Sequence, residues 1–576
     1  NFFAIEKTAK SKQDQALSDS IDITQVVEPL VPITVRQSML LPLAASESKS
    51  IELGLANGTV TQDGKAIGGI SLQLRDSLLG QSDELNQWFA RYPFTCYEQL
   101  AAVAVGLDNQ AAWDKLMLNM PLYLDSHGLL KYFPGSRNQG SPYLTSYLLS
   151  LSLHAKRIGL TMEIPEAHKE RMLRALQAVF EGRLTTELYN NEWRWGERLA
   201  ALTTLAEYGQ VAARTALSYY EQHNKWNMND WVNWLIIAKS LQDPAMAQLA
   251  DDAQANLSAM LSREGQMLVP LNNELTSAWW TMFNRNANLA RLLFVVVDDP
   301  KWSNEMPYLL NGLINLQRNG HWGTTVANTY AKLAMQAYAK THEHEINIGD
   351  LTAVLTASDE ASAEPTKTVT NITSELFENN QSYYPAMMTW PSDSDSTLDL
   401  AFEGQGKLWV DVSAYTAVAL TEPKYAGYKV EREVLPVLQQ KAGQWTQGDV
   451  YRVTLKIHAN APMTWVVVTD PIPSGATILG SGLGRDSLIL QEQSEQAAGE
   501  TSYGTWGSWS AFVERGNESY RAYYSRFAQG ETTLNYTVRL NHTGEFNLPP
   551  TRVETLYHPD IYGELPNLEP LKVEVK

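Results

Sequence analysis

The spacing of hydrophobic residues changes twice along the chain and divides it into three parts. Between about residues 30 and 55, apolar and polar positions alternate, which predicts strands. Over residues 81–345 the apolar positions recur every three or four residues, as in the stretch 144–151, which predicts helices joined by short loops. From about Ile348 the period returns to two, as in residues 453–457. The order of the three parts is therefore strands, helices, strands.

Strand-like sequence on both sides of a helical block is the pattern that a helical domain inserted into a β domain produces. Many aromatic residues on the helix faces favour a compact array, of which a ring of helical hairpins is one form. We divide the chain into a linker with the first part of a β domain (1–80), a helical domain (81–345), the second part of the β domain (346–426) and a last β domain (427–576). The final part is most simply one or two β-sandwiches.

Composition narrows the class of protein. The net charge of −19 argues against nucleic-acid binding, which needs a basic patch. No run of about 18 apolar residues is present, so no membrane-spanning segment is expected. A single cysteine in 576 residues excludes a disulfide scaffold. The first residue is Asn1, without an initiator Met or secretory pattern, so we expect a piece of a longer protein.

That single cysteine, Cys96, lies at a predicted helix start. Thr95 and Glu98 have the spacing of a capping box, which makes Thr95 the N-cap and Gln99 the fourth helical residue. Cys96 and Gln99 then share one helix face, so the thiol can approach the amide. The free N–H groups at the helix start favour a thiolate. A small buried core residue is the plainer alternative for Cys96.

Other candidates for chemistry are weak. No phosphate-binding loop, dinucleotide fingerprint or H-E-x-x-H motif is present. The close pair His342 and His344, each followed by Glu, is better explained as a solvated linker than as a metal site. His127 and His223 could assist an acyl transfer, but a histidine in a loop is usually only solvated. We therefore expect neither a metal nor a cofactor.

Four segments carry a resemblance to a known family. Cys-Tyr-Glu-Gln at residues 96–99 resembles the C-x-E-Q thioester motif of the α2-macroglobulin and complement superfamily, in its bacterial form. His-Trp-Gly-Thr-Thr at 321–325 is similar to the start of the closing helix of that family's thioester domain. Residues 427–433 and 548–560 resemble the start and the last strands of the bacterial terminal macroglobulin-like domain. The resemblance covers about residues 30–576, in the expected order.

The resemblance implies a multidomain α and β architecture. An α/α toroid thioester domain is inserted into a CUB-like β-sandwich, and a macroglobulin-like β-sandwich follows. It also implies that this is the C-terminal part of a larger protein. The bait region, earlier macroglobulin domains and a lipid-attachment signal would lie upstream. The protein would then be periplasmic, anchored to the inner membrane by that N-terminal lipid.

The implied activity is inhibition of proteases, in defence of the cell, and not enzymatic turnover. Cys96 and Gln99 would form an internal thioester, with Glu98 in a supporting role. A protease that cuts the bait region would expose the bond, and a Lys amine of the attacker would be acylated by Gln99. The partners are thus attacking proteases and the upstream domains, with no nucleic acid and no cofactor.

Two departures from the family pattern stand out. Position 97 is Tyr where Leu or Gly is usual, which leaves the reacting pair intact. Position 556 is Leu where bacterial relatives tend to have Met before a Tyr, here Tyr557. We expect Tyr92, Leu556 and Tyr557 to shield the thioester from water across a domain interface.

Two other functions remain possible from the sequence. A helical toroid also carries terpene or prenyl cyclases and carbohydrate-active enzymes, but the block has no D-x-D-D motif and no clear pair of catalytic carboxylates. A relative without a thioester could act as a purely steric trap. Retention of Cys96, Glu98 and Gln99 together counts against that alternative.

Overall fold

The structure is a computed structural model that describes residues 2–5, 18–21, 29–75, 77–79, 83–135, 139–185, 194–241, 243–272, 281–343, 348–358, 367–372, 386–480 and 508–575. The chain divides into two compact units, Asn1–Pro32 and Ile33–Lys576. The first unit contains an antiparallel hairpin of β1 (Phe2–Ile5) and β2 (Ser18–Ile21). All further description concerns the second unit.

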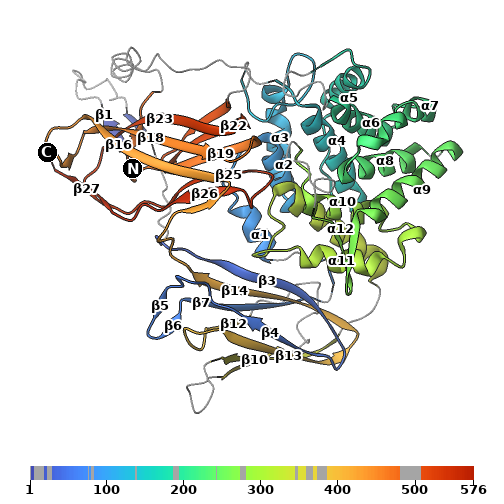
Figure 1. The fold of residues 1–576 in the computed structure, drawn as a ribbon, viewed down its shortest axis with the longest axis horizontal. Coiled ribbons are helices and arrows are strands. Elements are labelled where there is room, and N and C mark those ends of the chain that lie inside the picture. The colour runs from blue at the N-terminus through green and yellow to red at the C-terminus, as the bar shows by residue number, and fades with distance from the viewer. Residues whose placement is uncertain are drawn as a thin grey trace, which may run out of the picture. The chain divides into compact units, whose positions relative to one another are not determined.

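Strands from before and after the helical block pair with each other (Figure 1). Two four-stranded sheets, β11-β10-β13-β4 and β12-β7-β14-β3, enclose one hydrophobic core. The strands are β3 (Ile33–Ala44), β4 (Ser48–Leu53), β7 (Gly68–Arg75), β10 (Ile348–Ala357), β11 (Lys367–Ile372), β12 (Ala386–Met388), β13 (Ser396–Gln405) and β14 (Lys407–Ala417). A small hairpin of β5 (Thr61–Gln62) and β6 (Lys65–Ala66) turns at Asp63-Gly64, where both residues have positive φ. The helical block therefore interrupts a β-sandwich in sequence.

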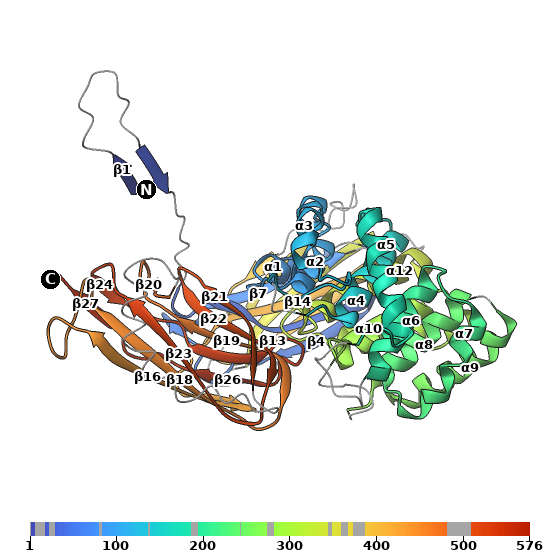
Figure 2. The ribbon, with the colours of Figure 1, turned by 90° about the horizontal axis from the view of Figure 1, so that it is seen from above.

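The helical block contains twelve α-helices within the described residues, and Figures 1 and 2 show them gathered together. They are α1 (Asp83–Ala90), α2 (Tyr97–Gly106), α3 (Gln110–Tyr123), α4 (Pro142–Arg157), α5 (Glu166–Phe180), α6 (Arg194–Glu207), α7 (Ala213–Leu217), α8 (Met228–Leu241), α9 (Pro244–Ala259), α10 (Arg285–Val296), α11 (Met306–Asn315) and α12 (Thr325–His342). A hairpin of β8 (Leu261–Glu264) and β9 (Met267–Pro270) packs against α11. The predicted helical stripe at residues 144–151 is confirmed in α4.

Burial alternates along the series of helices. Helices α2, α4, α8, α10 and α12 are buried almost all round, whereas α3, α5 and α9 bury only one face. The last helix, α12, packs against α2 near the start of the block. Thr329 of α12 donates to the carbonyl of Ala102, and Lys332 donates to that of Gly106 at 2.9 Å. The series of helices thus closes on itself.

Glu343 joins the two points where the chain enters and leaves the helical block. Its carboxylate accepts from the hydroxyl of Ser77 at 2.6 Å and from the backbone N–H of Leu78 at 3.0 Å, just after β7. It also accepts from the indole N–H of Trp409 on β14 at 2.8 Å. We call Glu343 and these three donors the neck. One carboxylate therefore fixes both chain crossings against the sheet.

A second β region follows, with its own core. A six-stranded sheet, β15-β26-β25-β19-β22-β21, packs on the four-stranded sheet β16-β18-β23-β20, and β17-β27-β24 forms a third sheet. The strands are β15 (Lys424–Ala426), β16 (Tyr428–Leu438), β17 (Trp445–Thr446), β18 (Val450–Ala459), β19 (Met463–Pro471), β20 (Thr477–Ile478), β21 (Trp509–Arg515), β22 (Ser519–Phe527), β23 (Gly530–Arg539), β24 (Gly544–Phe546), β25 (Thr551–Thr555), β26 (Tyr562–Leu565) and β27 (Leu571–Glu574). Among the described residues, no helix is long and apolar enough to cross a membrane.

Candidate functional site

Cys96 caps the first turn of α2. The structure corrects the predicted capping box by one residue, because Cys96 is the N-cap and Gln99 is the N3 residue. The backbone N–H of Cys96 donates to Oε1 of Gln99 at 3.1 Å, and the backbone N–H of Gln99 points to the Cys96 side chain. Glu98 is free of the predicted capping role because its carboxylate turns toward α12. The capping box is therefore formed by Cys96 and Gln99, and not by Thr95 and Glu98.

The amide of Gln99 is held at both ends. Its Nε2 donates to the hydroxyl of Tyr92 at 3.2 Å, while its Oε1 accepts from Cys96. Cys96 and Gln99 are both 0% exposed. The backbone N–H of Cys96 is placed where negative charge would develop on Oε1 if a nucleophile attacked the amide carbon. The arrangement therefore favours acyl chemistry at Gln99 and orients the amide nitrogen toward Tyr92.

Burial sets the ionisation of the Cys96 thiol. Removal from water raises the pKa of Cys96 well above its ordinary value, and the neighbouring Glu98 raises it further. Hydrogen bonds from the backbone N–H groups of Gln99 and Glu98 act in the opposite direction but do not prevail. The expectation that the helix start favours a thiolate is therefore wrong for this closed structure, since desolvation outweighs the helix dipole.

Glu98 connects three distant parts of the chain. Its carboxyl oxygens accept from the hydroxyl of Thr325 at 2.9 and 3.1 Å, and Oε2 also accepts from the hydroxyl of Tyr557 at 3.0 Å. Thr325 is the first residue of α12, and Tyr557 follows β25 in the last β region. Burial raises the pKa of Glu98 to about 7, although these two hydrogen bonds lower it.

The segment Leu556–Tyr557 crosses from the last β region to the helical block. The backbone N–H of Leu556 donates to the carbonyl of Trp465 on β19 at 2.9 Å. The carbonyl of Tyr557 accepts from Nδ2 of Asn284, the N-cap of α10, at 3.2 Å. Both Leu556 and Tyr557 are buried in the same apolar cluster as Cys96. Tyr92, also predicted as a shield, is partly buried against that cluster.

Aromatic rings from both sides close the site. From the helical block, Tyr92 contacts Phe94, with ring centroids 5.6 Å apart, and Phe94 contacts Tyr523 of β22 at 6.2 Å. Phe133 stacks on Phe512 of β21 at 4.8 Å. Such edge-to-face and stacked pairs add to the free energy of burial. The residues that surround Cys96 thus come from both sides of the contact between the helical block and the last β region.

Trp465 has an unusual backbone conformation at this contact. Its φ is +54°, a left-handed value that costs free energy for a bulky side chain. The ladder between β19 and β22 skips Trp465, which pairs with no residue of β22 in the register. Its ring lies 3.8 Å from that of Tyr132, centroid to centroid. The ladder resumes in the same register on both sides of Trp465, so the left-handed residue is a local break in pairing that places its ring against Tyr132 of the helical block.

The turn before α12 is built by the motif at residues 321–325. The backbone N–H of Trp322 donates to Oδ1 of Asn328 at 2.6 Å, and Thr324 caps α12. Gly323 has φ +91°, and a Cβ there would lie 3.0 Å from the ring of Pro559. His321 lies 5.1 Å from the ring of Trp88, and burial lowers the pKa of His321 to about 4.

The remaining histidine candidates do not join the site. His127 and His223 are exposed, whereas Cys96 is fully buried. His342 contacts the carbonyl of Val297 through Nε2 at 2.8 Å, and His344 and Glu345 lie outside the described residues. Within the part of the chain that the structure describes, no group of three or more His, Cys, Asp or Glu residues could hold a metal ion.

Sequence reasoning missed two members of the site. Thr325 lies 227 residues from Glu98 and was recognised only as part of a helix-start motif. Trp465 lies within an apolar strand, where no Gly or Pro signals its left-handed backbone. A buried Glu in a predicted apolar helix was the one available signal that a distant donor is needed.

Comparison with known proteins gives one family match and several relatives. Residues 427–560 match the family model described as the bacterial alpha-2-macroglobulin MG10 domain. An alpha-2-macroglobulin homolog of Nostoc sp. is 23% identical over 401 residues, which cover 66% of this chain and 19% of the relative. The chain thus spans about a fifth of the length of that relative.

Solved structures share the fold over nearly the whole chain. Native alpha-2-macroglobulin from Escherichia coli, from domain MG7 to the C-terminus, has a TM-score of 0.68 at 16% identity and covers 97% of this chain and 84% of that one. Salmonella alpha-2-macroglobulin reacted with methylamine has a TM-score of 0.67 at 15% identity and covers 98% of this chain and 35% of that one. Residues 427–560 therefore match a bacterial alpha-2-macroglobulin domain, and the fold of the chain is similar to that of the C-terminal region of bacterial alpha-2-macroglobulins.

Proposed function

We propose that this chain is the thioester-bearing part of a protease inhibitor that traps its attackers covalently. The observation that carries the proposal is the pairing of Cys96 with Gln99 on one helical turn, fully buried, with the amide oriented at both ends. The similarity to alpha-2-macroglobulins supports inhibition of proteases as the activity. The bait region would lie upstream in the larger protein, and the target proteases would be partners of that whole protein.

Formation of the bond is a condensation. The sulfur of Cys96 attacks the side-chain carbonyl carbon of Gln99, the carbon–nitrogen bond breaks, and the thiol proton leaves with the nitrogen as ammonia. The Cys96 backbone N–H at 3.1 Å from Oε1 stabilises the charge that develops there. The hydroxyl oxygen of Tyr92 accepts a hydrogen bond from the departing nitrogen, Nε2 of Gln99. The product is an internal thioester between Cys96 and Gln99.

Trapping reverses this condensation, with an amine of the attacking protease in place of ammonia. A Lys amine of the attacker attacks the Gln99 carbonyl carbon, an amide forms, and the sulfur of Cys96 leaves and takes up a proton. In the closed structure two effects suppress this reaction. Water and amines are excluded, and burial raises the free energy of the leaving thiolate, as the raised pKa of Cys96 indicates. Exposure of the site removes both obstacles, and the inhibitor is consumed in a single reaction.

The shield consists of Tyr92, Leu556 and Tyr557. Tyr92 covers the amide nitrogen of Gln99, and the segment Leu556–Tyr557 is tied to Glu98 and Asn284 of the helical block. Separation of the last β region from the helical block would withdraw Leu556 and Tyr557 together. The site would then open without rearrangement of α2 itself.

The domain arrangement is part of the proposal. The alternating burial and the contact of α12 with α2 support an α/α toroid, and the pairing of β7 with β14 supports its insertion into a CUB-like sandwich. We assign residues 1–80 to a linker and the first part of the CUB-like domain, 81–345 to the thioester domain, 346–426 to the second part and 427–576 to the macroglobulin-like domain. The location is the periplasm, with a lipid anchor upstream.

The two other functions are less well supported. The similarity to alpha-2-macroglobulins does not favour an enzyme built on a helical toroid. A steric trap without a thioester would not need Cys96 and Gln99 to be paired and fully buried, nor Glu98 to be held by two hydroxyls.

Intact mass and thiol titration test the proposal on freshly purified native protein. We expect a mass lower by one ammonia than the sequence predicts and no titratable thiol. Methylamine should then add its mass to Gln99 and release one thiol. Gln99→Ala is the matched control, because it keeps Cys96 but cannot form the bond. A Cys96 that reacts with a thiol reagent in fresh native protein would exclude the thioester and leave the fold intact.

A further inference from the structure

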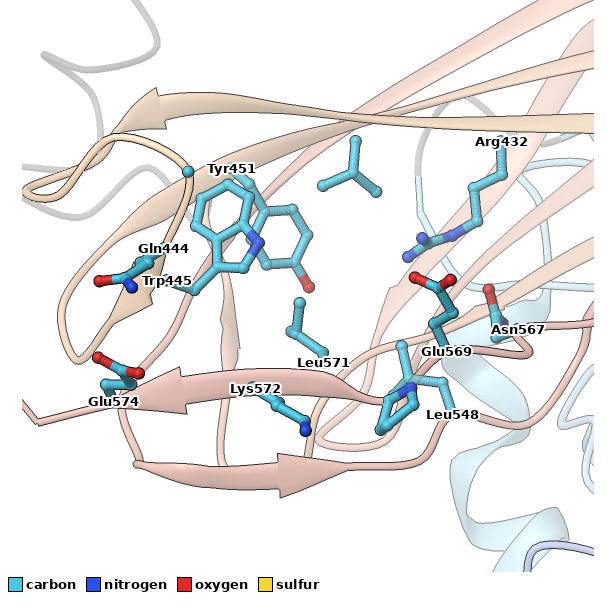
Figure 3. A pocket seen from close by; sticks show the side chains of 13 residues that line it. Arg432, Gln444, Trp445, Tyr451, Leu548, Asn567, Glu569, Leu571, Lys572 and Glu574 are labelled. Atoms are coloured by element: carbon cyan, nitrogen blue, oxygen red, sulfur yellow. The ribbon is translucent and has the colours of Figure 1, made fainter.

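A pocket at the end of the last β region, remote in sequence from Cys96, has the features of a built binding site. It has a volume of about 660 Å³, within the range of small-ligand sites. Residues from β16, β17, β18 and β27 line it, together with Leu548 and Pro570. Figure 3 shows the rings of Trp445 and Tyr451 forming one wall of this pocket. Their centroids are 5.5 Å apart.

One buried polar group in the pocket lacks a protein partner among the described residues. Tyr451 is 1% exposed, and its hydroxyl has no hydrogen-bond partner among the described residues. In Figure 3 this hydroxyl is directed into the space beside Leu571. Burial raises the pKa of Tyr451, so the hydroxyl keeps its proton and remains a donor. A buried hydroxyl without an acceptor is costly, and an occupant of the pocket would relieve that cost.

Arg432 presents a guanidinium to the same space. Its Nε donates to both oxygens of the buried Asp470 at 3.0 and 3.1 Å. Tyr536 and Thr551 also donate to Asp470, so the carboxylate is fixed from three sides. Figure 3 shows the terminal nitrogens of Arg432 turned toward the pocket. A guanidinium held through Nε keeps its two terminal nitrogens oriented for a second carboxylate.

We propose that this pocket binds a carboxylate attached to an apolar side chain, as at the C-terminal residue of a peptide. The carboxylate would lie between Arg432 and the hydroxyl of Tyr451, and the apolar group would pack on Trp445. Glu569, Glu574 and Lys572 line the same pocket, and Lys572 is already paired with Glu545 at 3.6 Å. The negative charges of Glu569 and Glu574 disfavour a dianion such as a phosphate monoester relative to a singly charged carboxylate.

The test uses N-acetylphenylalanine, the peptide acetyl-Ala-Ala-Phe with a free carboxylate, and the same peptide as its amide. Binding is measured by titration calorimetry in about 0.15 M NaCl, because the net charge of −19 repels anions at low salt. We expect saturable binding of both acids and none of the amide. Tighter binding of the peptide would identify a peptide end as the source, and equal binding would identify the isolated acid. Equal binding of amide and acid would overturn the proposal, as would no saturation by either acid at about 10 mM.

Variants distinguish a direct loss of ligand binding from a loss of the fold. Tyr451→Phe removes only an unpartnered hydroxyl and should weaken binding about tenfold. Glu569→Gln removes a competing charge and should strengthen binding roughly threefold. Arg515→Met, an exposed arginine of β21, is the control and should change nothing. Arg432 itself is kept, since its loss would leave Asp470 buried without a cation. Unchanged affinity in Tyr451→Phe would contradict the assignment.

The pocket and the thioester are independent proposals. The lining residues all lie between 432 and 574, and Cys96 is not among them. Cys96→Ala protein should therefore bind the three probes as the wild type does. Failure of thiol titration to show a thioester would leave this binding site unaffected.

Discussion

At Glu98, burial and hydrogen bonding act in opposite directions on one carboxyl group. Thr325 and Tyr557 favour the charged form, but removal from water dominates and raises the pKa of Glu98 to about 7. A carboxyl whose pKa is higher in the folded protein than in the unfolded chain binds its proton more tightly when folded. Its contribution to stability is therefore complete below about pH 4.5 and is lost as the pH rises to about 7.

Glu98→Gln should remove this pH dependence. The amide oxygen still accepts from Thr325 and Tyr557, but no charge is buried. From the pKa difference, the wild type should lose about 3 kcal/mol of stability between pH 4.5 and pH 8 that the variant does not lose. Denaturant midpoints across that range measure the slope. Glu163→Gln, on an exposed side chain, is the control, and a Glu98→Gln slope equal to that of wild type would contradict the assignment.

Tyr557 contributes both a ring and a hydroxyl to the proposed shield. Tyr557→Ala removes both, so methylamine should inactivate the proposed thioester about tenfold faster or more. Tyr557→Phe keeps the ring and loses only the hydrogen bond to Glu98, so its rate should be intermediate. Release of the Cys96 thiol over time gives the rates. Tyr425→Ala, on a half-exposed side chain, is the control. An unchanged rate in Tyr557→Ala would remove this residue from the shield.

At the scale of elements, the neck joins the two ends of the helical block to the β-sandwich. The neck brings the end of α12 next to the residue that follows β7, and both are bonded through Glu343 to β14. Three donors converge on one carboxylate, so the entry and exit of the inserted block are held at one point. The rest of the block can then fold as a closed series of helices.

Glu343→Ala should therefore destabilise the β-sandwich that contains β7 and β14. The indole N–H of Trp409 and the backbone N–H of Leu78 would lose their acceptor while partly buried, at a cost of about 2–4 kcal/mol. Glu343→Gln keeps one acceptor oxygen and should cost less. Denaturant unfolding followed by tryptophan fluorescence measures both variants. Equal midpoints for Glu343→Ala and wild type would show that the neck is not needed for stability.

At the scale of the whole molecule, the site is closed only while the helical block and the last β region are in contact. Cys96 and Gln99 come from the helical block, whereas Leu556 and Tyr557 come from the other side. Trp465 takes part in this contact, with its ring against those of Tyr132 and Phe133. Contacts between domains couple their unfolding, so loss of this contact should separate their transitions.

Trp465→Ala should uncouple the helical block from the last β region. We expect calorimetry to show thermal transitions that lie further apart than in wild type, and any thioester to react faster with methylamine. Trp445→Ala is a matched control, because this tryptophan belongs to the same β region but lines the pocket at residues 432–574. Similar changes in both variants would indicate general destabilisation and would contradict a specific role of Trp465.

The sequence predicted the elements well because their periods are local properties. The change near Ile348 and the stripe in α4 depend only on residues a few positions apart. The pairing of Cys96 with Gln99 was also within reach, since both lie on one turn. The capping box was misplaced by one residue because Thr95 and Cys96 offer similar local patterns, and only the contacts of Glu98 with α12 decide between them.

The protonation of Cys96 and the role of Trp465 could not be predicted in this way. A helix dipole is visible in the sequence, but the loss of water around Cys96 is produced by residues from both sides of a tertiary contact. The left-handed backbone of Trp465 interrupts its pairing with β22, and no Gly at this position marks it in the sequence. Both features depend on residues hundreds of positions apart.

The single peptide bond between Leu556 and Tyr557 has a mechanical consequence. Leu556 is bonded to Trp465 of the last β region, whereas Tyr557 is bonded through its hydroxyl and its carbonyl to the helical block. A force that pulls the last β region away from the helical block therefore acts on two adjacent residues, with no flexible segment between their hydrogen bonds. The hydrogen bonds of Tyr557 to Glu98 and Asn284 would rupture together, so the proposed thioester would be exposed in one step and not gradually.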